Sequence, residues 1–138
     1  LVVDEPTAGL DPEERLRFRN LLSELGAEKL VIMSTHIVSD VESVASELAI
    51  MRNGKLIGFD TPENLINQAY GQIWTVKLAN ADVEAMRQRV QVLHTQRQGE
   101  LVLFRIAHAT QPHADAELVQ PNLEDALMAQ RYSLQEVA

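Results

Sequence analysis

Residues 1–12 read Leu-Val-Val-Asp-Glu-Pro-Thr-Ala-Gly-Leu-Asp-Pro, and they are the main indication of the fold of the first half of the chain. Its apolar run ends abruptly in two adjacent carboxylates, Asp4 and Glu5. A continuous apolar run that closes on charge predicts a buried parallel strand. Open α/β sheets bind ligands at the carboxyl ends of such strands. One carboxylate there can hold a hard divalent cation, usually through water, and the other can orient or deprotonate an attacking water.

The residues that follow predict a helix. Asp11 can be the N-cap, Pro12 would occupy the first helical position, and Glu14 completes a capping-box pattern. Gly26 is expected to end the helix. Apolar residues recur with the helical period and predict its buried face: they are Phe18, Leu21, Leu22 and Leu25. Three arginines fall mostly off this stripe, and their simplest interpretation is a solvated face: they are Arg15, Arg17 and Arg19.

A second apolar run, residues 29–34, predicts a strand parallel to the first. The helix between the two strands makes a βαβ crossover, which is almost always right-handed. This crossover places the carboxyl ends of both strands at the same edge of the sheet. We therefore expect Glu5 and His36 to lie close together, although 31 positions separate them in the sequence (36 − 5 = 31).

Three segments now resemble the motifs of ABC-type ATPases. Residues 1–6 resemble the Walker B strand, residues 7–12 resemble the D-loop, and Ser-Thr-His at 34–36 resembles the switch-histidine loop. Each alone would be a weak indication, whereas the ordered set is specific. The resemblance implies an α/β fold: part of the parallel sheet of a P-loop NTPase (ABC ATPase), closed by a β-hairpin and a helix and followed by a small α+β accessory domain.

The resemblance also implies roles for individual residues. Asp4 would help to hold Mg²⁺, through water, near the β- and γ-phosphates of ATP, and Glu5 would be the base or orienter of the hydrolytic water. His36 would contact the γ-phosphate, and Asp11 would reach a second nucleotide-binding subunit across a nucleotide-sandwich dimer. Without the resemblance, the two acids can be a solvated strand end, and His36 can be a strand-end or cap histidine. Asp11 can cap its helix and serve the dimer at once.

Several family motifs have no counterpart in the 138 residues. There is no Gly-x-x-x-x-Gly-Lys-Ser/Thr phosphate loop, no Leu-Ser-Gly-Gly-Gln-type signature and no glutamine-loop segment. The chain also starts inside a predicted strand, on Leu1. These features predict the C-terminal portion of a longer ATPase. We expect the piece alone neither to bind ATP tightly nor to hydrolyse it, because the backbone cradle and the lysine for the phosphates are missing.

The pattern after residue 36 predicts two domains, 1–70 and 71–138, with the boundary at Gly71. Asn53-Gly54 between two apolar runs is a strong hairpin signal. The first domain would end with a helix over 38–48, strands over 47–52 and 55–60, and a short helix from Thr61-Pro62. The second would read β-α-β-β-α: a strand over 73–79, a helix capped by Asn80, strands over 92–96 and 100–107, a loop over 108–120 with a short extended piece, and a helix capped by Asn122 and Asp125. Trp74 is expected to pack in the core or between domains.

Composition narrows the possible partners. The formal net charge of −8 argues against nucleic acid as the main partner, since such binding relies on basic patches. The absence of cysteine excludes disulfides and thiolate metal sites, and the three later histidines (His94, His108 and His113) have no companions at ligand spacing. No apolar run is long enough to span a membrane. The resemblance implies a cytoplasmic subunit, peripheral on the inner face of the cell membrane through a transmembrane permease subunit.

Three functional hypotheses remain open. The first is an ABC transporter ATPase subunit that couples ATP hydrolysis to a separate membrane subunit; residues 119–128 resemble the end of an accessory domain of exporter-type members, which favours an ABC-2-like exporter. The second is an ABC-type ATPase of translation or DNA repair. Translation members usually read Asn-His where this chain has Ala8-Gly9, and repair members carry coiled coils and basic surface. The third is a non-enzymatic regulatory or dimerisation fragment.

Overall fold

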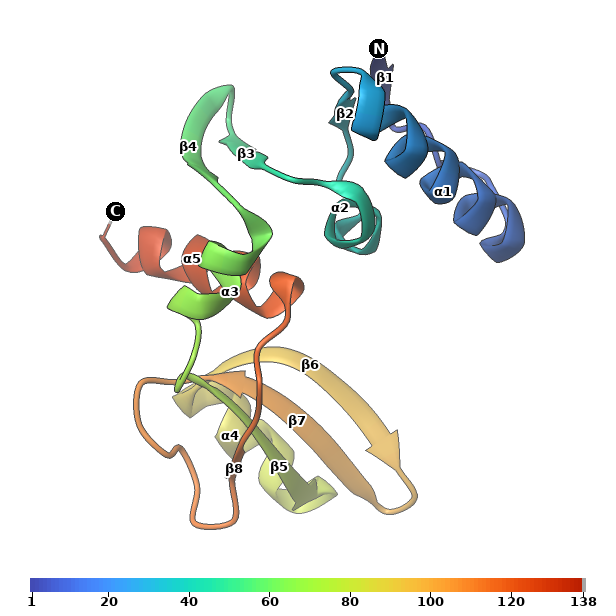
Figure 1. The fold of residues 1–138 in the computed structure, drawn as a ribbon. Coiled ribbons are helices and arrows are strands. Elements are labelled where there is room, and N and C mark those ends of the chain that lie inside the picture. The colour runs from blue at the N-terminus through green and yellow to red at the C-terminus, as the bar shows by residue number, and fades with distance from the viewer. Residues whose placement is uncertain (138) are drawn as a thin grey trace. The chain divides into compact units, whose positions relative to one another are not determined.

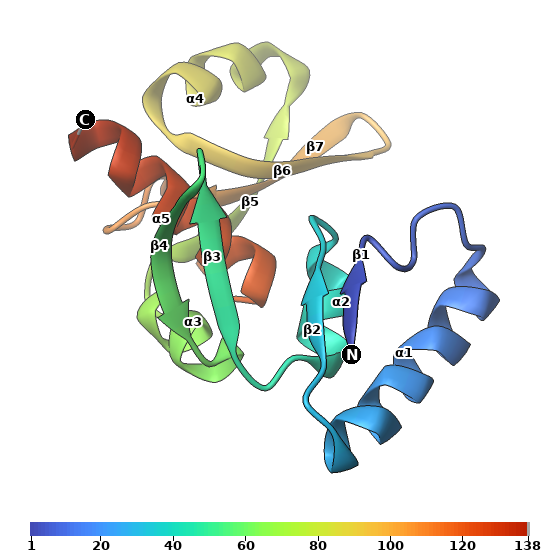
Figure 2. The same ribbon diagram turned by 90° about the horizontal axis from the view of Figure 1, so that it is seen from above.

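The computed structural model describes residues 1–137, and it describes side chains for residues 1–130. The chain forms two compact units, Leu1–Pro62 and Glu63–Ala138, and each is considered by itself. Helix α3 (Pro62–Gln68) belongs almost entirely to the second unit, whereas the sequence placed the domain boundary after it, at Gly71. Leu65 of this helix is buried, and so is Ala69 directly after it. In both views α3 lies beside α5 (Leu123–Val137) (Figures 1 and 2).

The first unit begins with the expected βαβ arrangement. Strands β1 (Val2–Asp4) and β2 (Ile32–Ser34) pair in parallel, and Asp4 lies opposite Ser34. Helix α1 (Pro12–Glu28) connects them (Figure 1). The parallel pairing predicted from the two apolar runs is confirmed, and it sets the ends of both strands side by side.

Helix α1 begins as predicted but ends later. The Glu14 N–H donates to Asp11 Oδ1 at 2.9 Å, and Glu14 Oε2 accepts from the Asp11 N–H at 3.4 Å, so the capping box is confirmed. The prediction that Gly26 ends the helix was wrong. Lys29 takes an extended conformation and caps the helix through its N–H to the Leu25 carbonyl. The helix therefore continues past Gly26 to Glu28, and the following strand begins at Ile32 rather than at residue 29.

The inward face of α1 includes an arginine. Leu22 is buried, Phe18 and Leu25 are half-buried, and Leu21 is 49 % exposed. The interpretation of a wholly solvated arginine face was wrong, because the half-buried Arg19 pairs with Asp40 of α2 (Val38–Val44) at 3.4 Å. Arg19 precedes Leu22 by three residues, so both lie on one side of the helix.

Helix α2 stops at Val44, four residues before the predicted end (48 − 44 = 4), because Ala45 is already extended. Strands β3 (Leu48–Arg52) and β4 (Lys55–Asp60) then form the predicted antiparallel hairpin. Asn53 and Gly54 connect them, with φ of +50° and +75°. Positive φ at both central residues is the backbone that a tight two-residue hairpin turn requires.

Burial in the first unit differs from the expectation. The first strand was predicted to be buried, yet Val2 is 75 % exposed, and Ile32 on its neighbour is 54 % exposed. A sheet of only two short strands leaves most of its apolar surface in contact with solvent. Leu22 is the one hydrophobic residue of 1–62 that belongs to the buried core.

The second unit is built on an antiparallel sheet in the order β6-β7-β5-β8. Its elements follow the predicted β-α-β-β-α order, and the extended piece in the loop over 108–120 pairs as a short strand. Helix α4 lies against the sheet, separately from α3 and α5 (Figure 2). The bounds are β5 (Ile73–Ala79), the 3₁₀ turn η1 (Asn80–Asp82), α4 (Val83–Arg89), β6 (Gln91–Gln98), β7 (Leu101–Ala107) and β8 (Glu117–Leu118).

The main core lies between α4 and one face of this sheet. Alternate residues of β5 and β7 point towards Met86 of α4, as the two-residue period of a strand requires. Trp74 packs against this core, and its Nε1–H donates to the His108 carbonyl at 2.9 Å, which confirms a packing role. The core residues are Val76, Leu78, Met86, Val102, Phe104, Ile106 and Ala116.

Caps in the second unit follow the sequence at one helix and not at another. At α5, the Asp125 N–H donates to Asn122 Oδ1 at 2.8 Å and the Asn122 N–H donates to Asp125 Oδ2 at 2.9 Å, as predicted. The prediction that Asn80 caps a helix was wrong, because its side chain accepts from Arg97 at 3.2 Å instead. Among the described residues, no helix is both long and apolar enough to cross a membrane.

Candidate functional site

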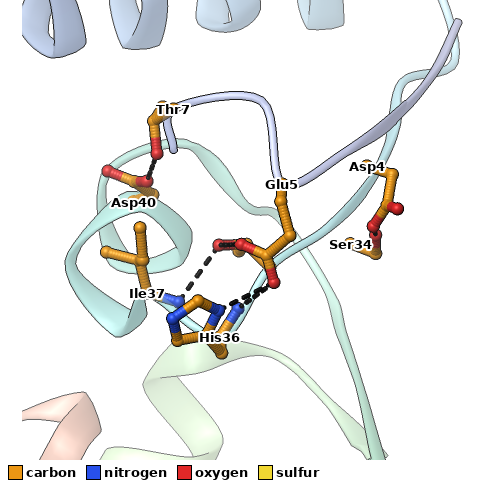
Figure 3. Close-up of polar contacts among 8 residues, drawn as sticks. Asp4, Glu5, Thr7, Ser34, His36, Ile37 and Asp40 are labelled. Carbon is orange, nitrogen blue, oxygen red and sulfur yellow. Dashed lines mark hydrogen bonds and ion pairs between the residues drawn. The ribbon is translucent and has the colours of Figure 1, made fainter. Parts of the chain in front are cut away.

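Glu5 and His36 meet at the carboxyl ends of β1 and β2 (Figure 3). The His36 ring nitrogen Nδ1 lies 2.8 Å from Glu5 Oε1, and the His36 backbone N–H donates to the same oxygen at 3.0 Å. The hydroxyl of Thr35 donates to Glu5 Oε2 at 3.2 Å. The proximity predicted from the parallel crossover is therefore confirmed, and it involves three donors from one short loop.

The backbone at Glu5 turns its side chain towards this loop. Glu5 has a φ of +43°, in the left-handed region that residues other than glycine rarely occupy. Its N–H donates to the Ser34 carbonyl at 2.7 Å, so the pairing of the two strands extends one residue beyond β1. The Ile37 N–H donates to Thr35 Oγ1 at 3.0 Å and so orients the hydroxyl. Backbone conformations of this kind concentrate at functional sites.

The charge of this pair sits close to solvent. The side chain of Glu5 is 35 % exposed and that of His36 is 83 % exposed. The hydrogen bond from His36 lowers the pKa of Glu5, and the Thr35 hydroxyl adds to the effect. Glu5 is therefore an ionised carboxylate at neutral pH, fixed in place by the loop, and chemically able to orient a water molecule.

Asp4 and Asp11 do not join this pair. Asp4 is exposed and lies on the other side of the strand, where it accepts a hydrogen bond from the Ser34 hydroxyl (Figure 3). Asp11 caps α1. In the described part of the chain, no three histidine or carboxylate side chains gather closely enough to hold a metal. Asp4 fits the partial role that proteins usually play for Mg²⁺, in which water and phosphate oxygens supply most of the ligands.

Sequence reasoning missed a buried polar cluster beside the pair. Thr7 is 0 % exposed and Asp40 is 1 % exposed, and the Thr7 hydroxyl donates to Asp40 Oδ2 (Figure 3). Arg19 pairs with the same carboxylate. A weak signal existed, since Asp40 lies within one helical turn of the apolar residues Ile37, Val41 and Val44. That spacing places Asp40 on an inward face, but it does not reveal the partner.

No protein-family model matches the chain. Individual relatives do match, among them several ATP-binding proteins of transporters. The chain is 36 % identical over 88 residues to Nod factor export ATP-binding protein I of Ralstonia nicotianae, and 31 % identical over 109 residues to the protein of that name from Cupriavidus metallidurans. It is 46 % identical over 66 residues to the energy-coupling factor transporter ATP-binding protein EcfA2 of Lactobacillus acidophilus.

These matches cover 63 %, 77 % and 47 % of the chain, and 27 %, 36 % and 23 % of the relatives. The chain therefore spans only about a quarter to a third of their length. The fold of the first unit and its acid–imidazole pair define an α/β protein with a candidate site at the end of a parallel sheet. By similarity, the chain is a homologue of the ATP-binding proteins of ABC transporters, as its opening motifs indicated.

Proposed function

We propose that this chain is part of the ATP-binding subunit of an ABC transporter, which hydrolyses ATP and drives a separate transmembrane permease subunit. The observation that carries the proposal is the contact of Glu5 with His36 at the carboxyl ends of two parallel strands. The transporter relatives support it, and they give no comparable support to an ATPase of translation or DNA repair. A nucleotide-sandwich dimer, with Asp11 reaching the second subunit, belongs to the same proposal.

The chemistry follows from the side chains. Phosphoryl transfer depends mainly on positioning and on the stabilisation of charge. Glu5, already ionised, would orient or deprotonate the attacking water. The His36 nitrogen that faces Glu5 carries a proton, because a carboxylate only accepts hydrogen bonds. The other ring nitrogen can then donate to the γ-phosphate only when the ring is cationic. Mg²⁺, held near Asp4 through water, would supply neutralisation of the phosphate charge.

The type of transporter is a finer part of the proposal. Several relatives, including the two Nod factor proteins above, are named as export proteins, and residues 119–128 resemble the end of an exporter accessory domain, so we favour an ABC-2-like exporter. Its location would be the cytoplasmic face of the membrane, through the permease. Co-purification with a membrane protein would support this assignment. Sedimentation of residues 71–138 as a dimer would favour the dimerisation role instead.

The main test is Glu5→Gln in a longer protein that carries this chain together with a phosphate loop. We expect ATP binding to change less than about twofold and turnover to fall by about 10²–10⁴-fold, as loss of a positioned base does. The matched control is Glu13→Gln, because Glu13 is 75 % exposed on α1 and its carboxylate bonds only a surface arginine. Turnover close to the unmodified protein in Glu5→Gln would remove Glu5 as the base.

A second test concerns the 138-residue chain alone. It contains no phosphate loop, so we expect it to bind Mg-ATP more weakly than about millimolar and to show no turnover. Isothermal titration with Mg-ATP measures the affinity directly. Micromolar affinity in this chain would contradict the expectation that other segments must cradle the phosphates.

A further inference from the structure

We propose that Thr7, Asp40 and Arg19 form a buried positioning cluster that sets the distance between Glu5 and His36 for ATP hydrolysis. The inference rests on the proposed function and deepens it. None of the three residues needs to touch nucleotide. Each would act by holding the segment that carries one of the two reacting side chains.

The cluster joins three elements of the first unit. Thr7 comes from the loop after β1, Asp40 comes from α2, and Arg19 comes from α1. The Thr7 hydroxyl donates to Asp40 Oδ2 (Figure 3). Arg19 Nε lies 3.4 Å from Asp40 Oδ1. Arg19 also donates from Nη1 to the Ser43 hydroxyl at 3.1 Å. The carboxylate of Asp40 is thus the common partner of two segments that are distant in the sequence.

Burial makes this carboxylate sensitive to its partners. A charge removed from water is tolerated only where nearby groups replace its hydration. Asp40 is 1 % exposed, and the side chain of Arg19 is 22 % exposed. The buried carboxylate is therefore most stable when the loop and the two helices keep a single position relative to one another. A fixed placement of this kind is what a positioning device requires.

The cluster is close in sequence to both reacting residues. Thr7 follows Glu5 by two residues, and Asp40 follows His36 by four. The Glu5 carbonyl accepts from the Ala8 N–H at 3.2 Å and closes a turn that contains Thr7. The Asp40 N–H donates to the Ile37 carbonyl at 3.1 Å and closes a turn directly after His36. A shift of Thr7 against Asp40 would therefore shift Glu5 against His36.

The pair cannot fix this distance unaided. The His36 side chain is 83 % exposed, and ion pairs at such exposure are weak because water and salt screen them. The buried contact behind it is shielded from solvent and salt, which makes it the stiffer of the two links. Misplacement by about 1 Å can lower turnover by about 10²-fold, so a small displacement is sufficient.

The test compares Thr7→Val with Thr7→Ser in the longer ATPase. Valine keeps the shape and removes the hydroxyl, whereas serine keeps the hydroxyl. We expect Thr7→Val to lower kcat by about 10- to 100-fold while KM and the ATP Kd change by less than about twofold, and Thr7→Ser to restore most of the turnover. Asp40→Asn should resemble Thr7→Val. Arg17→Ala, at an exposed ion pair of α1, is the control and should leave kcat unchanged.

The outcomes separate the two proposals. If the unmodified longer protein does not hydrolyse ATP, the proposed function fails. If it does hydrolyse ATP and Thr7→Val keeps its kcat, the positioning role is overturned. A lower melting temperature with unchanged kcat per folded molecule would also overturn it, because that result defines a purely structural contact. If Asp40→Asn does not fold, the comparison of Thr7→Val with Thr7→Ser still tests the positioning role.

Discussion

Among single residues, Glu5 shows how local contacts set both the charge and the direction of a carboxylate. Its left-handed backbone turns the side chain towards the loop after β2, where three donors meet its two oxygens. Those bonds stabilise the ionised form and lower the pKa of Glu5. The two properties that a water-orienting group needs, charge and fixed direction, thus come from the same loop.

The shift in the pKa of Glu5 is directly measurable. Carbon-detected NMR titration should place it below the ordinary glutamate value of about 4.3, and His36→Ala should move it back towards that value. Because the folded-state pKa lies below the unfolded one, the interaction stabilises the fold above the unfolded pKa and is lost as pH falls through the folded pKa. That window lies on the acid side of about pH 4.

A control for this titration is available in the second unit. His94→Ala removes another exposed histidine, which lies on β6 and belongs to the other unit. It should leave the pKa of Glu5 unchanged. A Glu5 that titrates at its ordinary value in the unmodified chain would mean that the His36 contact is not maintained in solution.

At the scale of elements, the first turn of α5 is joined to the sheet by one carboxylate. The carboxylate of Asp125 accepts two hydrogen bonds from Arg105 of β7, one from Nε at 2.8 Å and one from Nη2 at 2.6 Å. Arg105 lies between Phe104 and Ile106 on β7, and both of these residues belong to the main core. Because successive side chains of a strand point to opposite faces, Arg105 and the first turn of α5 lie on the face of the sheet away from that core. The hydrogen bonds that Arg105 donates to Asp125 raise the pKa of Arg105. One residue therefore caps a helix and docks it.

We expect Asp125→Ala to lower the free energy of unfolding of the second unit by about 2–3 kcal/mol. The change removes the helix cap and leaves Arg105 without its carboxylate, while the 25 % exposure of the arginine side chain moderates the cost. Urea denaturation followed by fluorescence of Trp74, the one tryptophan of the chain, measures it. The control Glu124→Ala, exposed on the same turn, should cost less than about 0.5 kcal/mol. Equal effects of the two changes would contradict the docking role.

At the scale of the whole molecule, the two units differ in how much apolar surface they bury. Among the side chains that the structure describes, thirteen hydrophobic ones are buried, and twelve of these belong to the second unit. The first unit instead exposes large apolar side chains, among them Leu1, Val2, Leu30 and Ile32. Exposed apolar surface of this kind promotes association. We therefore expect the 138-residue chain to self-associate, and a monodisperse monomer with cooperative melting would contradict this.

Hydrogen exchange should separate the two units within the intact chain. Amides of β5 and β7 should exchange at least about 100-fold more slowly than those of β1 and β2, because the free energy of local opening is small where little apolar surface is buried. Mass spectrometry of peptides from both units gives the comparison in one experiment. Equal protection would mean that the first unit is stabilised by interactions other than its own core.

Local features of the fold and one distant contact could be predicted from the order of residues alone. The capping residues Asp11 and Asn122 and the Asn53-Gly54 turn act through bonds to near neighbours, so their outcome could be read from spacing alone. The contact of Glu5 with His36 followed because a parallel crossover allows one outcome for the ends of its strands.

The identity of the buried polar residues followed only from the packing of elements that are distant in the sequence. Thr7 and Asp40 are 33 positions apart, and neither carries a local mark of its partner. The sequence pattern predicted a surface position for Arg19, but α2 packs against α1 and brings Asp40 to it. In each case the result depends on a group that the fold brings near, and the short-range energies that a sequence pattern reports do not include that group.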